Sequence, residues 1–274
     1  MDQAVRFRWL GIAGIELRAS DQILVIDPFV TRPSFRHMWL GRVRSNSALV
    51  TAAVPQCDFV LVTHAHHDHI MDVPGVIQQT GAMAFGSPNT CRLLTILGVP
   101  EERIHKIKVG DRFPLGHFQV EVLPAEHLKV PGFSPGPLLP RLQPPLRIRD
   151  YRIDTCFSFL IEVGGQRWLD WSSACSEPAL PADVLWVAPG ANAAYYEALL
   201  TVVQPRIILP IHWDDLFRPL SKPVRPYWKT PRLGFPPLKR VDLTEFRHMI
   251  KQIAPEAKVF IPEMFHRYDL SECL

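Results

Sequence analysis

The sequence predicts an α/β fold in the form of a four-layer αβ/βα sandwich, with a single domain spanning residues 1–274. Short apolar runs alternate with segments of helical periodicity along most of the chain, as expected for strands that are covered by helices. Both halves have this pattern, and an apolar content of 47% in 274 residues is enough for a layered core. A fixed-period repeat is not visible, so a solenoid is not expected.

The expected strands are short runs of aliphatic, β-branched and aromatic residues. In the first half they are Val5–Trp9, Gly14–Leu17, Ile23–Ile26, Phe59–Val62, Ala82–Phe85, Ile104–Ile107 and Phe118–Leu123. In the second half they are Phe157–Val163, Arg167–Trp171, Val184–Ala188, Arg206–Pro210 and Lys258–Ile261. Helices are expected over Ile70–Gln79, Ala191–Val203 and Asp242–Ile253. Two β-rich halves with helices outside bring their loops to one edge, where we expect the functional site.

The strongest functional signal is the segment His64-Ala65-His66-His67-Asp68-His69, which contains four of the eleven histidines. Imidazole and carboxylate groups bind zinc and similar divalent ions, and one short segment can present them to two ions. The segment follows an apolar run and precedes a helix-compatible one, so it is expected on a strand-to-helix turn. The sequence therefore predicts a metal site at this turn.

This HxHxDH pattern after a strand resembles the metallo-β-lactamase superfamily, and the resemblance extends along most of the chain. Trp9–Leu17 and Ile23–Pro28 are similar to the opening hairpin of that fold, which ends in Asp-Pro. Pro124–His127 and Leu209–His212 each place a histidine at the end of an apolar stretch, where this family supplies its remaining histidine ligands. The opening segment and His212–Phe217 are most similar to the branch of L-ascorbate-6-phosphate lactonase and N-acylphosphatidylethanolamine phospholipase D.

The resemblance implies two metal ions. One is expected at His64, His66 and His127, and the other at Asp68, His69 and His212. We expect zinc as one or two ions, with manganese or iron as alternatives. Such a pair lowers the pKa of a shared water and polarises the bond under attack, so a serine or cysteine nucleophile is not needed. Asp68 is accordingly expected to be both a metal ligand and a catalytic residue.

The bridging carboxylate is the point at which the chain departs from the family pattern. Where the family usually has a Gly-Asp-Thr-like turn, the sequence is Arg167-Trp168-Leu169-Asp170-Trp171-Ser172-Ser173-Ala174. Asp170 is the acid at hand, and it can serve as the bridging, catalytic metal ligand. Alternatively, Ser173 occupies that position, as in the Gly-Ser-Ala of some branch members. The second ion would then lose an anionic ligand and bind more weakly. The sequence leaves both alternatives open.

Other polar residues near these motifs are expected to support the site. Asp27, after the apolar run Ile23–Ile26, is interpreted as the acceptor for the free ring N–H of a ligand histidine; otherwise it merely ends a strand in an Asp-Pro turn. Asp214 and Asp215 are expected to orient His212 or to cap a turn.

The remaining histidines are not expected to bind metal. His67, at the variable position of the motif, is expected either to support the site without binding metal or to lie at the surface. Glu126 is expected to be a surface neighbour of the site. The histidines without a metal-ligand context are His37, His105, His117, His248 and His266.

Two proline-rich segments are expected as loop insertions near residues 130–150 and 219–240. They are Val130–Pro145, followed by the basic Leu146–Arg152, and Pro219–Arg240. Proline lacks an amide donor and fixes φ, so these segments resist regular structure. Each follows a candidate ligand histidine. They either form a wall or lid of a substrate pocket or are solvated loops or oligomer contacts, and their position alone does not decide.

The composition indicates which classes of binding partner and which cellular location to expect. A net charge of +3 is far from the concentrated positive field of a nucleic-acid-binding protein, so a nucleic-acid partner is not expected. Five cysteines without CxxC spacing are expected to be reduced thiols. Met1–Arg6 lacks the features of a signal peptide, and no apolar run approaches a membrane span. We therefore expect a cytoplasmic protein without a transmembrane segment, and a homo-oligomer is compatible with the sequence.

Two classes of function follow. The first is a metal-dependent hydrolase in which a metal-activated water attacks an ester, lactone, amide or phosphodiester bond of a small molecule or lipid. The second is a non-catalytic or redox metal-binding member of the same fold. The complete histidine set favours the first class, and the open question of the bridging carboxylate keeps the second. The sequence does not identify the substrate, because specificity lies in loops.

Overall fold

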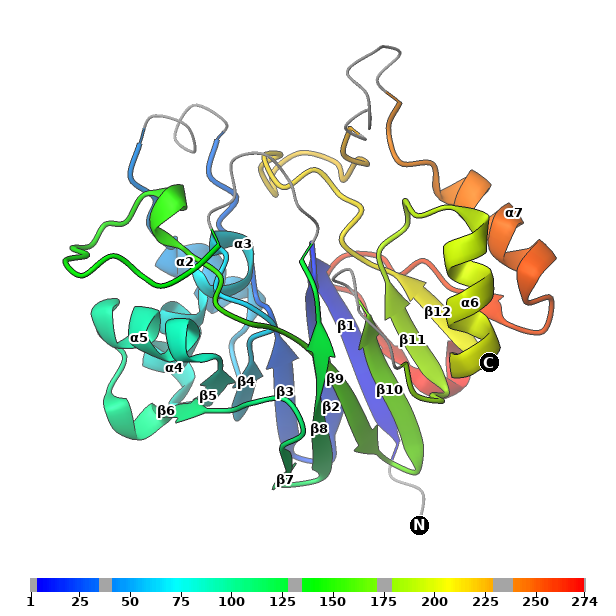
Figure 1. Ribbon diagram of the computed structural model, residues 1–274, viewed down its shortest axis with the longest axis horizontal. Helices are drawn as coiled ribbons and strands as arrows, with labels where there is room; N and C mark the ends of the chain where they lie inside the picture. Colours follow the sequence, from blue (N-terminus) through cyan, green and yellow to red (C-terminus); the bar gives the residue numbers. More distant parts are fainter. Residues whose placement is uncertain (1–3, 35–40, 128–134, 172–178, 229–238, 274) are drawn as a thin grey trace.

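Two sheets lie face to face, and helices cover the outer side of each (Figure 1). The computed structural model describes residues 4–34, 41–127, 135–171, 179–228 and 239–273. Three clusters of buried apolar side chains separate the layers. One fills the space between the sheets, one lies under the helices of the first half, and one lies under the helices of the second half. The four-layer αβ/βα sandwich expected from the sequence is therefore confirmed.

The first sheet has the order β14-β1-β2-β3-β4-β5-β6. Its strands are β1 (Val5–Gly11), β2 (Gly14–Ala19), β3 (Gln22–Ile26), β4 (Phe59–Leu61), β5 (Met83–Gly86), β6 (Ile104–Lys106) and β14 (Arg267–Asp269). Neighbours are antiparallel from β14 to β3 and parallel from β3 to β6. The helices of this half are α2 (Ser47–Ala53), α3 (His67–Ile70), α4 (Val73–Thr80) and α5 (Pro88–Ile96), followed by the 3-10 turn η1 (Glu101–Arg103).

The second sheet has the order β13-β12-β11-β10-β9-β8-β7. Its strands are β7 (Arg112–Leu115), β8 (Phe118–Ala125), β9 (Cys156–Val163), β10 (Gln166–Trp171), β11 (Val184–Val187), β12 (Ile207–Pro210) and β13 (Lys258–Val259). Neighbours are antiparallel from β7 to β10 and parallel from β10 to β13. The outer helices are α6 (Ala193–Val203) and α7 (Leu243–Ile253), and 3-10 turns occur at η2 (Ile148–Asp150) and η3 (Leu270–Cys273).

Large aromatic side chains from both sheets fill the space between them. The Trp168 ring lies 5.7 Å from that of Phe7 in the opposite sheet and 5.6 Å from that of Trp186 in its own, measured between ring centroids. All three side chains are almost completely buried. Such rings bury large apolar areas in defined geometries, so they fix how the two sheets lie against each other. This packing holds together the loop edges on which the candidate site is built.

The strand directions bring distant parts of the chain to one edge. In the first sheet, Ile26 pairs with Leu61 at the carboxyl ends of β3 and β4. In the second sheet, Trp171, Val187 and Pro210 are in register at the carboxyl ends of β10, β11 and β12. Strand β8 runs parallel to β10, because both are antiparallel to β9, and therefore ends at the same edge. The described candidate site residues lie at the ends of these strands or in the segments that directly follow them.

The structure corrects two features of the expected fold. The helix expected over Ile70–Gln79 is divided, because α3 ends at Ile70 and α4 begins at Val73 with Pro74 in its first turn. A proline at the start of a helix is favourable, whereas inside a helix it removes a hydrogen bond. The two sheets also do not correspond to the two halves of the strand list, because β8, expected in the first half, lies in the second sheet, and β14, close to the C-terminus, pairs with β1 of the first sheet.

The described parts of the two proline-rich segments contain little regular structure. Residues 135–150 hold one bridge and η2, and residues 219–228 and 239–240 hold isolated bridges. Cys57, Cys91, Cys156 and Cys273 are free thiols, as expected, and Cys175 lies outside the described residues. Across the described part of the chain, none of the helices combines the length and the apolar character needed to cross a membrane.

Candidate metal centre

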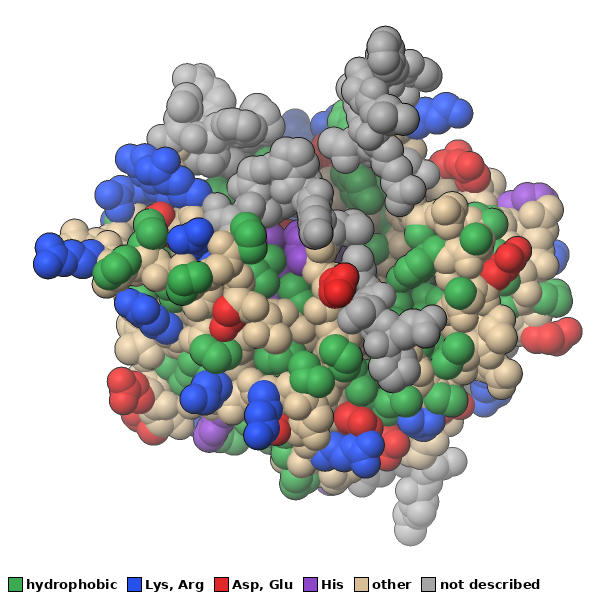
Figure 2. Space-filling model, in the orientation of Figure 1, with side chains coloured by type: hydrophobic (Ala, Val, Ile, Leu, Met, Phe, Trp, Pro, Cys, Tyr) green, Lys and Arg blue, Asp and Glu red, His purple; other side chains and the backbone are tan. Residues whose placement is uncertain are grey.

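The histidine-rich motif occupies the turn between β4 and α4. The chain leaves β4 in an extended conformation, and His66 precedes the first turn of α3 with φ −71° and ψ 153°. The four-residue helix α3 then carries His67, Asp68 and His69 inward, and all three are buried. The expected strand-to-helix turn is therefore present. In the space-filling view, histidine side chains are visible near the centre of this face (Figure 2).

His64, His66 and His127 form the first group of candidate ligands. One ligand nitrogen from each lies within 4.8 Å of the others. The ring centroids are 4.9 Å apart for His64 and His66, 4.9 Å for His64 and His127, and 4.5 Å for His66 and His127. His127 arrives from the end of β8, so residues more than sixty positions apart in the sequence converge here. The geometry suits three imidazole ligands around one ion.

Asp68, His69 and His212 form the second group, and their ligand atoms also lie within 4.8 Å of one another. Asp68 Oδ2 is 3.7 Å from His69 Nε2 and 3.8 Å from His212 Nε2. The rings of His64 and His69 are 3.9 Å apart, so the two groups are adjacent. His212 reaches this position from the loop after β12. The structure thus brings together, in two groups of three, the six side chains that the sequence suggested.

Buried polar atoms in these groups fit a bound cation. Nε2 of His64 and Oδ1 of Asp68 are inaccessible to solvent and have no hydrogen-bond partner among the described residues. A buried polar atom without a partner costs about 1–3 kcal/mol, and more when it is charged. Neutral imidazole nitrogens and a carboxylate are also the donor set that zinc and related ions prefer. The donor chemistry and the unsatisfied atoms therefore both fit a divalent metal.

Comparison with known proteins places this geometry in a family. The family model described as "Beta-lactamase superfamily domain" matches residues 23–168, which is more than half of the chain. The chain belongs to the metallo-β-lactamase superfamily.

Individual proteins similar to this chain are named metal-dependent hydrolases. The chain is 27% identical over 222 residues to a "UPF0173 metal-dependent hydrolase" of Carboxydothermus hydrogenoformans. The match covers 77% of this chain and 85% of the relative. It is 28% identical over 227 residues to a protein of the same description from Polynucleobacter asymbioticus, with coverage of 78% and 75%. The fold is similar to that of Igni18, a metallo hydrolase from Ignicoccus hospitalis, with a TM-score of 0.62, 17% identity and 97% coverage of both chains. The superfamily, the relatives and the two ligand groups agree on a metal-dependent hydrolase.

Asp27 and Thr63 connect the metallo-β-lactamase motif to the end of β3. Asp27 is completely buried, and its Oδ2 lies 2.6 Å from Nδ1 of His69. Its other oxygen accepts the Thr63 amide N–H at 2.8 Å, and the Thr63 hydroxyl donates to Oδ2. The same hydroxyl oxygen is 3.0 Å from Nδ1 of His64. Since the hydroxyl proton is directed to Asp27, its oxygen can accept from His64 Nδ1, and this leaves His64 Nε2 for a metal.

The contact expected of Asp27 is therefore present, and its role in fixing the His69 tautomer remains a prediction. Thr63 was not identified from the sequence, although it directly precedes the motif.

The protonation of the site matches metal binding. Burial lowers the pKa of His66 to about 2 and holds the pKa of His64 well below its usual value, so both rings are neutral at pH 7. Burial and the neighbouring His69 lower the pKa of His212. Burial by itself raises the pKa of Asp68, but the surrounding histidines, His69 first, outweigh it and keep the carboxyl ionised.

His69 is the exception in this group. Burial lowers its pKa, but the charges of Asp27 and Asp68 and the hydrogen bond to Asp27 outweigh burial and raise the pKa to about 9. The metal-free protein therefore holds a proton on His69 that a metal must displace.

Asp170 and Ser173 remain undecided. Asp170 is buried at the end of β10, opposite Trp186 in the β10–β11 pairing, and its charge contributes to the raised pKa of His69. Asp170 is not a member of either set of three. Ser173 lies outside the described residues. The identity of the bridging group is thus still a prediction.

The structure shows that His67 is not a surface residue. Its side chain is 1% exposed and packs edge-on against Phe29, with ring centroids 5.8 Å apart, and near Tyr151 at 6.3 Å. Nδ1 of His67 is 3.5 Å from Asp68 Oδ1. The surface interpretation is wrong because the His67 ring is buried against the rings of Phe29 and Tyr151. The other interpretation, support without metal binding, remains.

The other histidines and acids lie as follows. His105, His117, His248 and His266 are in neither ligand group, and His37 lies outside the described residues. Glu126 is exposed, as expected.

Asp215 accepts the Phe217 amide N–H at 3.2 Å and pairs with Arg225 at 3.0 Å, so it caps a turn. Asp214 contacts Ile12 and Arg32 instead. Arg32 was not singled out in the sequence, and it carries no motif that would have identified it.

The raised pKa of His69 predicts different pH dependences for the two ions. A metal at Asp68, His69 and His212 must displace one proton, so its affinity should rise about tenfold per pH unit up to about pH 9. His64 and His66 are already neutral, so the first ion should depend little on pH above about pH 7. Zinc titrations against a competing chelator, corrected for the protonation of the chelator, measure both affinities. Identical slopes for the two ions would contradict the assignment of the groups.

Proposed function

We propose that the protein is a metal-dependent hydrolase acting on an ester, lactone, amide or phosphodiester bond of a small-molecule or lipid-derived substrate. The observation that carries the proposal is the convergence of two three-residue ligand groups at one edge of the sandwich. The names of the relatives support hydrolysis as the reaction type. The bond and the substrate are inferred from the chemistry that such a site can perform.

His64, His66 and His127 would hold one ion, and Asp68, His69 and His212 the other. We propose zinc, with manganese or iron as alternatives, because imidazole and carboxylate donors suit all three. When bound, such ions lower the pKa of a water to supply a nucleophile at neutral pH and polarise the bond that is attacked.

The side chains of the protein supply charge and orientation. Asp68 is ionised at neutral pH because its pKa is held below the usual value, so it acts as an anionic ligand and not as a proton donor. Asp27 holds the Nδ1 side of His69 and thereby directs Nε2 toward Asp68. Asp170 would add a second carboxylate to the same group if it bridges the ions. The buried surroundings strengthen each of these interactions.

The finer assignment to the branch of L-ascorbate-6-phosphate lactonase and N-acylphosphatidylethanolamine phospholipase D is part of this proposal. It is supported by the opening segment and by the sequence His212–Phe217. Hydrolysis of a panel that contains sugar lactones, phosphodiesters and carboxyl esters would test it. Preference for one class of bond by at least about tenfold in kcat/KM, or about 1.4 kcal/mol, would assign the chemistry.

Replacement of His127 by alanine should remove one ligand from the first group, and replacement of His212 should remove one from the second. Both replacements should leave the core intact. Loss of a group that merely supports a ligand costs about 10- to 100-fold in affinity or activity, so loss of a ligand should reduce hydrolysis by more than about 100-fold. Metal content and hydrolysis of p-nitrophenyl acetate and bis(p-nitrophenyl) phosphate are measured on the same preparations.

His105→Ala and His117→Ala are the matched controls. His105 in β6 stacks on Phe85 in β5, and His117 lies near Asp21 on the surface, so neither replacement should change metal content or turnover. Equal losses in all four variants would contradict the ligand assignment.

Asp170→Ala and Ser173→Asp together decide the bridging position. If Asp170 bridges, its replacement should remove the second ion and lower turnover by several orders of magnitude, while Ser173→Asp adds little. If Ser173 occupies the bridging position, Ser173→Asp should tighten the second ion, and Asp170→Ala should act mainly on stability. Zinc stoichiometry of the two variants separates these cases. Wild-type metal content in both variants would mean that neither residue faces the ions.

A further inference from the structure

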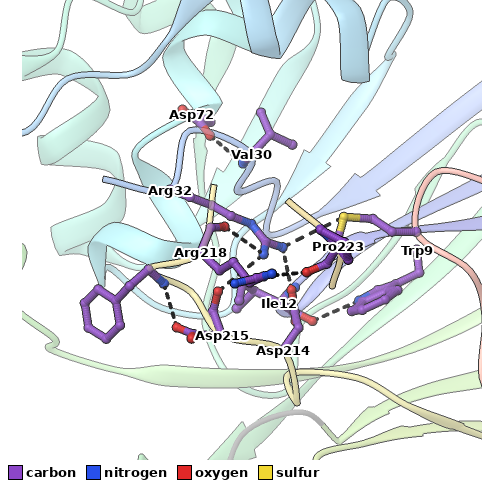
Figure 3. Close-up of polar contacts among 11 residues, drawn as sticks. Trp9, Ile12, Val30, Arg32, Asp72, Asp214, Asp215, Arg218 and Pro223 are labelled. Atoms are coloured by element: carbon purple, nitrogen blue, oxygen red, sulfur yellow. Dashed lines mark hydrogen bonds and ion pairs between the residues drawn. The ribbon is translucent and has the colours of Figure 1, made fainter. Parts of the chain in front are cut away.

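The backbone at His212 adopts a conformation that needs support. His212 has a left-handed φ of +54°, and its amide N–H donates to the carbonyl of Ile12 at 2.7 Å. Ile12 lies in the turn between β1 and β2 and is itself left-handed, with φ +48°, which is rare for a β-branched residue. The indole N–H of Trp9 donates to the same carbonyl at 3.1 Å (Figure 3). The direction of the His212 side chain therefore depends on a strained turn in another sheet.

Asp214 and Arg32 hold that turn in place. One carboxylate oxygen of Asp214 accepts the Ile12 amide N–H at 2.8 Å, and the other pairs with the Arg32 guanidinium at 2.5 Å (Figure 3). The Asp214 and Arg32 side chains are 0% and 3% exposed. The guanidinium also approaches the carbonyls of Asp215 and Arg218 at 3.4 and 3.5 Å. The ion pair thus ties the β1–β2 turn to the loop that carries His212.

The surrounding backbone is fitted to this guanidinium. Gly11 has φ +96°, and a Cβ atom at this position would lie 2.2 Å from Arg32 Nη2. A side chain at this position would therefore displace the guanidinium from Asp214. The close approach accounts for a glycine at the end of β1, because only glycine allows both this φ and this contact.

Arg32 is itself anchored at the other end of its side chain. Its φ is +45°. The Val30 amide donates to the buried carboxylate of Asp72 at 2.7 Å (Figure 3), and the Thr31 amide donates to the same oxygen at 2.8 Å. Asp27, at the start of this segment, contacts His69. One segment of six residues therefore reaches both histidines of the second group, His69 at its beginning and, through Arg32, the loop of His212 at its end.

We infer that Arg32 is a positioning residue of the second metal site: through Asp214 and Ile12 it fixes the backbone of His212 so that the imidazole faces Asp68. This inference rests on the proposed function only in that His212 is a metal ligand. Simple electrostatics predicts the opposite effect of removing Arg32, because loss of a nearby positive charge should tighten the binding of a divalent cation. A weaker affinity in a neutral variant would therefore report positioning and not charge.

The test is a zinc titration of the metal-free Arg32→Met protein against a competing chelator. We expect one ion to bind with wild-type affinity and the other to bind about 10- to 100-fold more weakly, the usual range when a group that orients a ligand is removed. Comparison with His212→Ala, which lacks that ligand, identifies the affected ion. The double variant Arg32→Met, Asp214→Asn should lose less than the sum of the two single losses, because the residues act in one chain of contacts.

Arg8→Met is the matched control. Arg8 is a second buried arginine, paired with the buried carboxylate of Glu16 and with the carbonyl of Ala53. When Arg8 is replaced, Glu16 still accepts a hydrogen bond from Arg267, just as Asp214 still accepts one from the Ile12 amide when Arg32 is replaced. Arg8→Met should therefore lower the melting temperature without changing either zinc affinity. Wild-type affinity for both ions in Arg32→Met, or an equal loss in Arg8→Met, would overturn the inference.

Asp214→Asn maintains the test if Arg32→Met does not fold. The asparagine oxygen can still accept the Ile12 amide, but its amide group cannot pair with the guanidinium. A folded Asp214→Asn protein with unchanged affinity for both ions would also overturn the inference. A wild-type protein that binds two ions but hydrolyses none of the test substrates would contradict the proposed function alone.

Discussion

The buried carboxylate of Asp27 is the contact on which the arrangement of the site depends. It lies at the end of β3 and accepts hydrogen bonds from the amide and the hydroxyl of Thr63, beside a close contact with His69 Nδ1. These bonds fix the first residues after β4, and therefore the start of the histidine motif. They also turn Nε2 of His69 toward Asp68. Without them, the motif would be a polar loop with no defined direction for its rings.

Two more buried carboxylates accept hydrogen bonds from backbone amides around the site. Asp72 accepts the amides at Val30–Thr31, and Asp214 accepts the amide of Ile12 while pairing with Arg32. A carboxylate buried in this way is stabilised by several donors at once, so it can join loops that have no regular structure of their own. These carboxylates do not belong to either ligand group, yet each fixes a segment next to one. The candidate ligands thus lie on loops and on the short helix α3, and buried acids hold the neighbouring segments in place.

The sequence predicted those parts of the fold and site that depend on local patterns. The apolar strands, the helices and the HxHxDH motif can each be recognised from a short stretch of sequence. His127 and His212 were identified because each ends an apolar stretch at a place where the metallo-β-lactamase family, which the chain resembles, supplies its remaining histidine ligands. The positions of the His127 and His212 side chains in space depend on tertiary contacts, which the sequence pattern does not show.

The contact between Arg32 and Asp214 illustrates what the sequence does not contain. The two residues are 182 positions apart, and although Asp214 lies beside a candidate ligand, nothing in the sequence relates it to Arg32. Their contact exists because β1, β3 and β12 end at one edge, and this depends on the packing of the two sheets. The short strand β14 was missed for the same reason: three residues carry no periodic signal, and the strand is defined only by pairing with β1. His67 is buried by contacts with Phe29 and Tyr151, which are distant from it in the sequence.

The central claim is that the two groups of three residues hold metal ions on which hydrolysis depends. The most direct measurement is elemental analysis of the purified protein before chelation, after chelation and after reconstitution, with hydrolysis measured on each sample. The account predicts between about one and two equivalents of divalent metal, with activity lost and regained in step with the metal. A protein that carries no transition metal when purified and takes up none on reconstitution would contradict it.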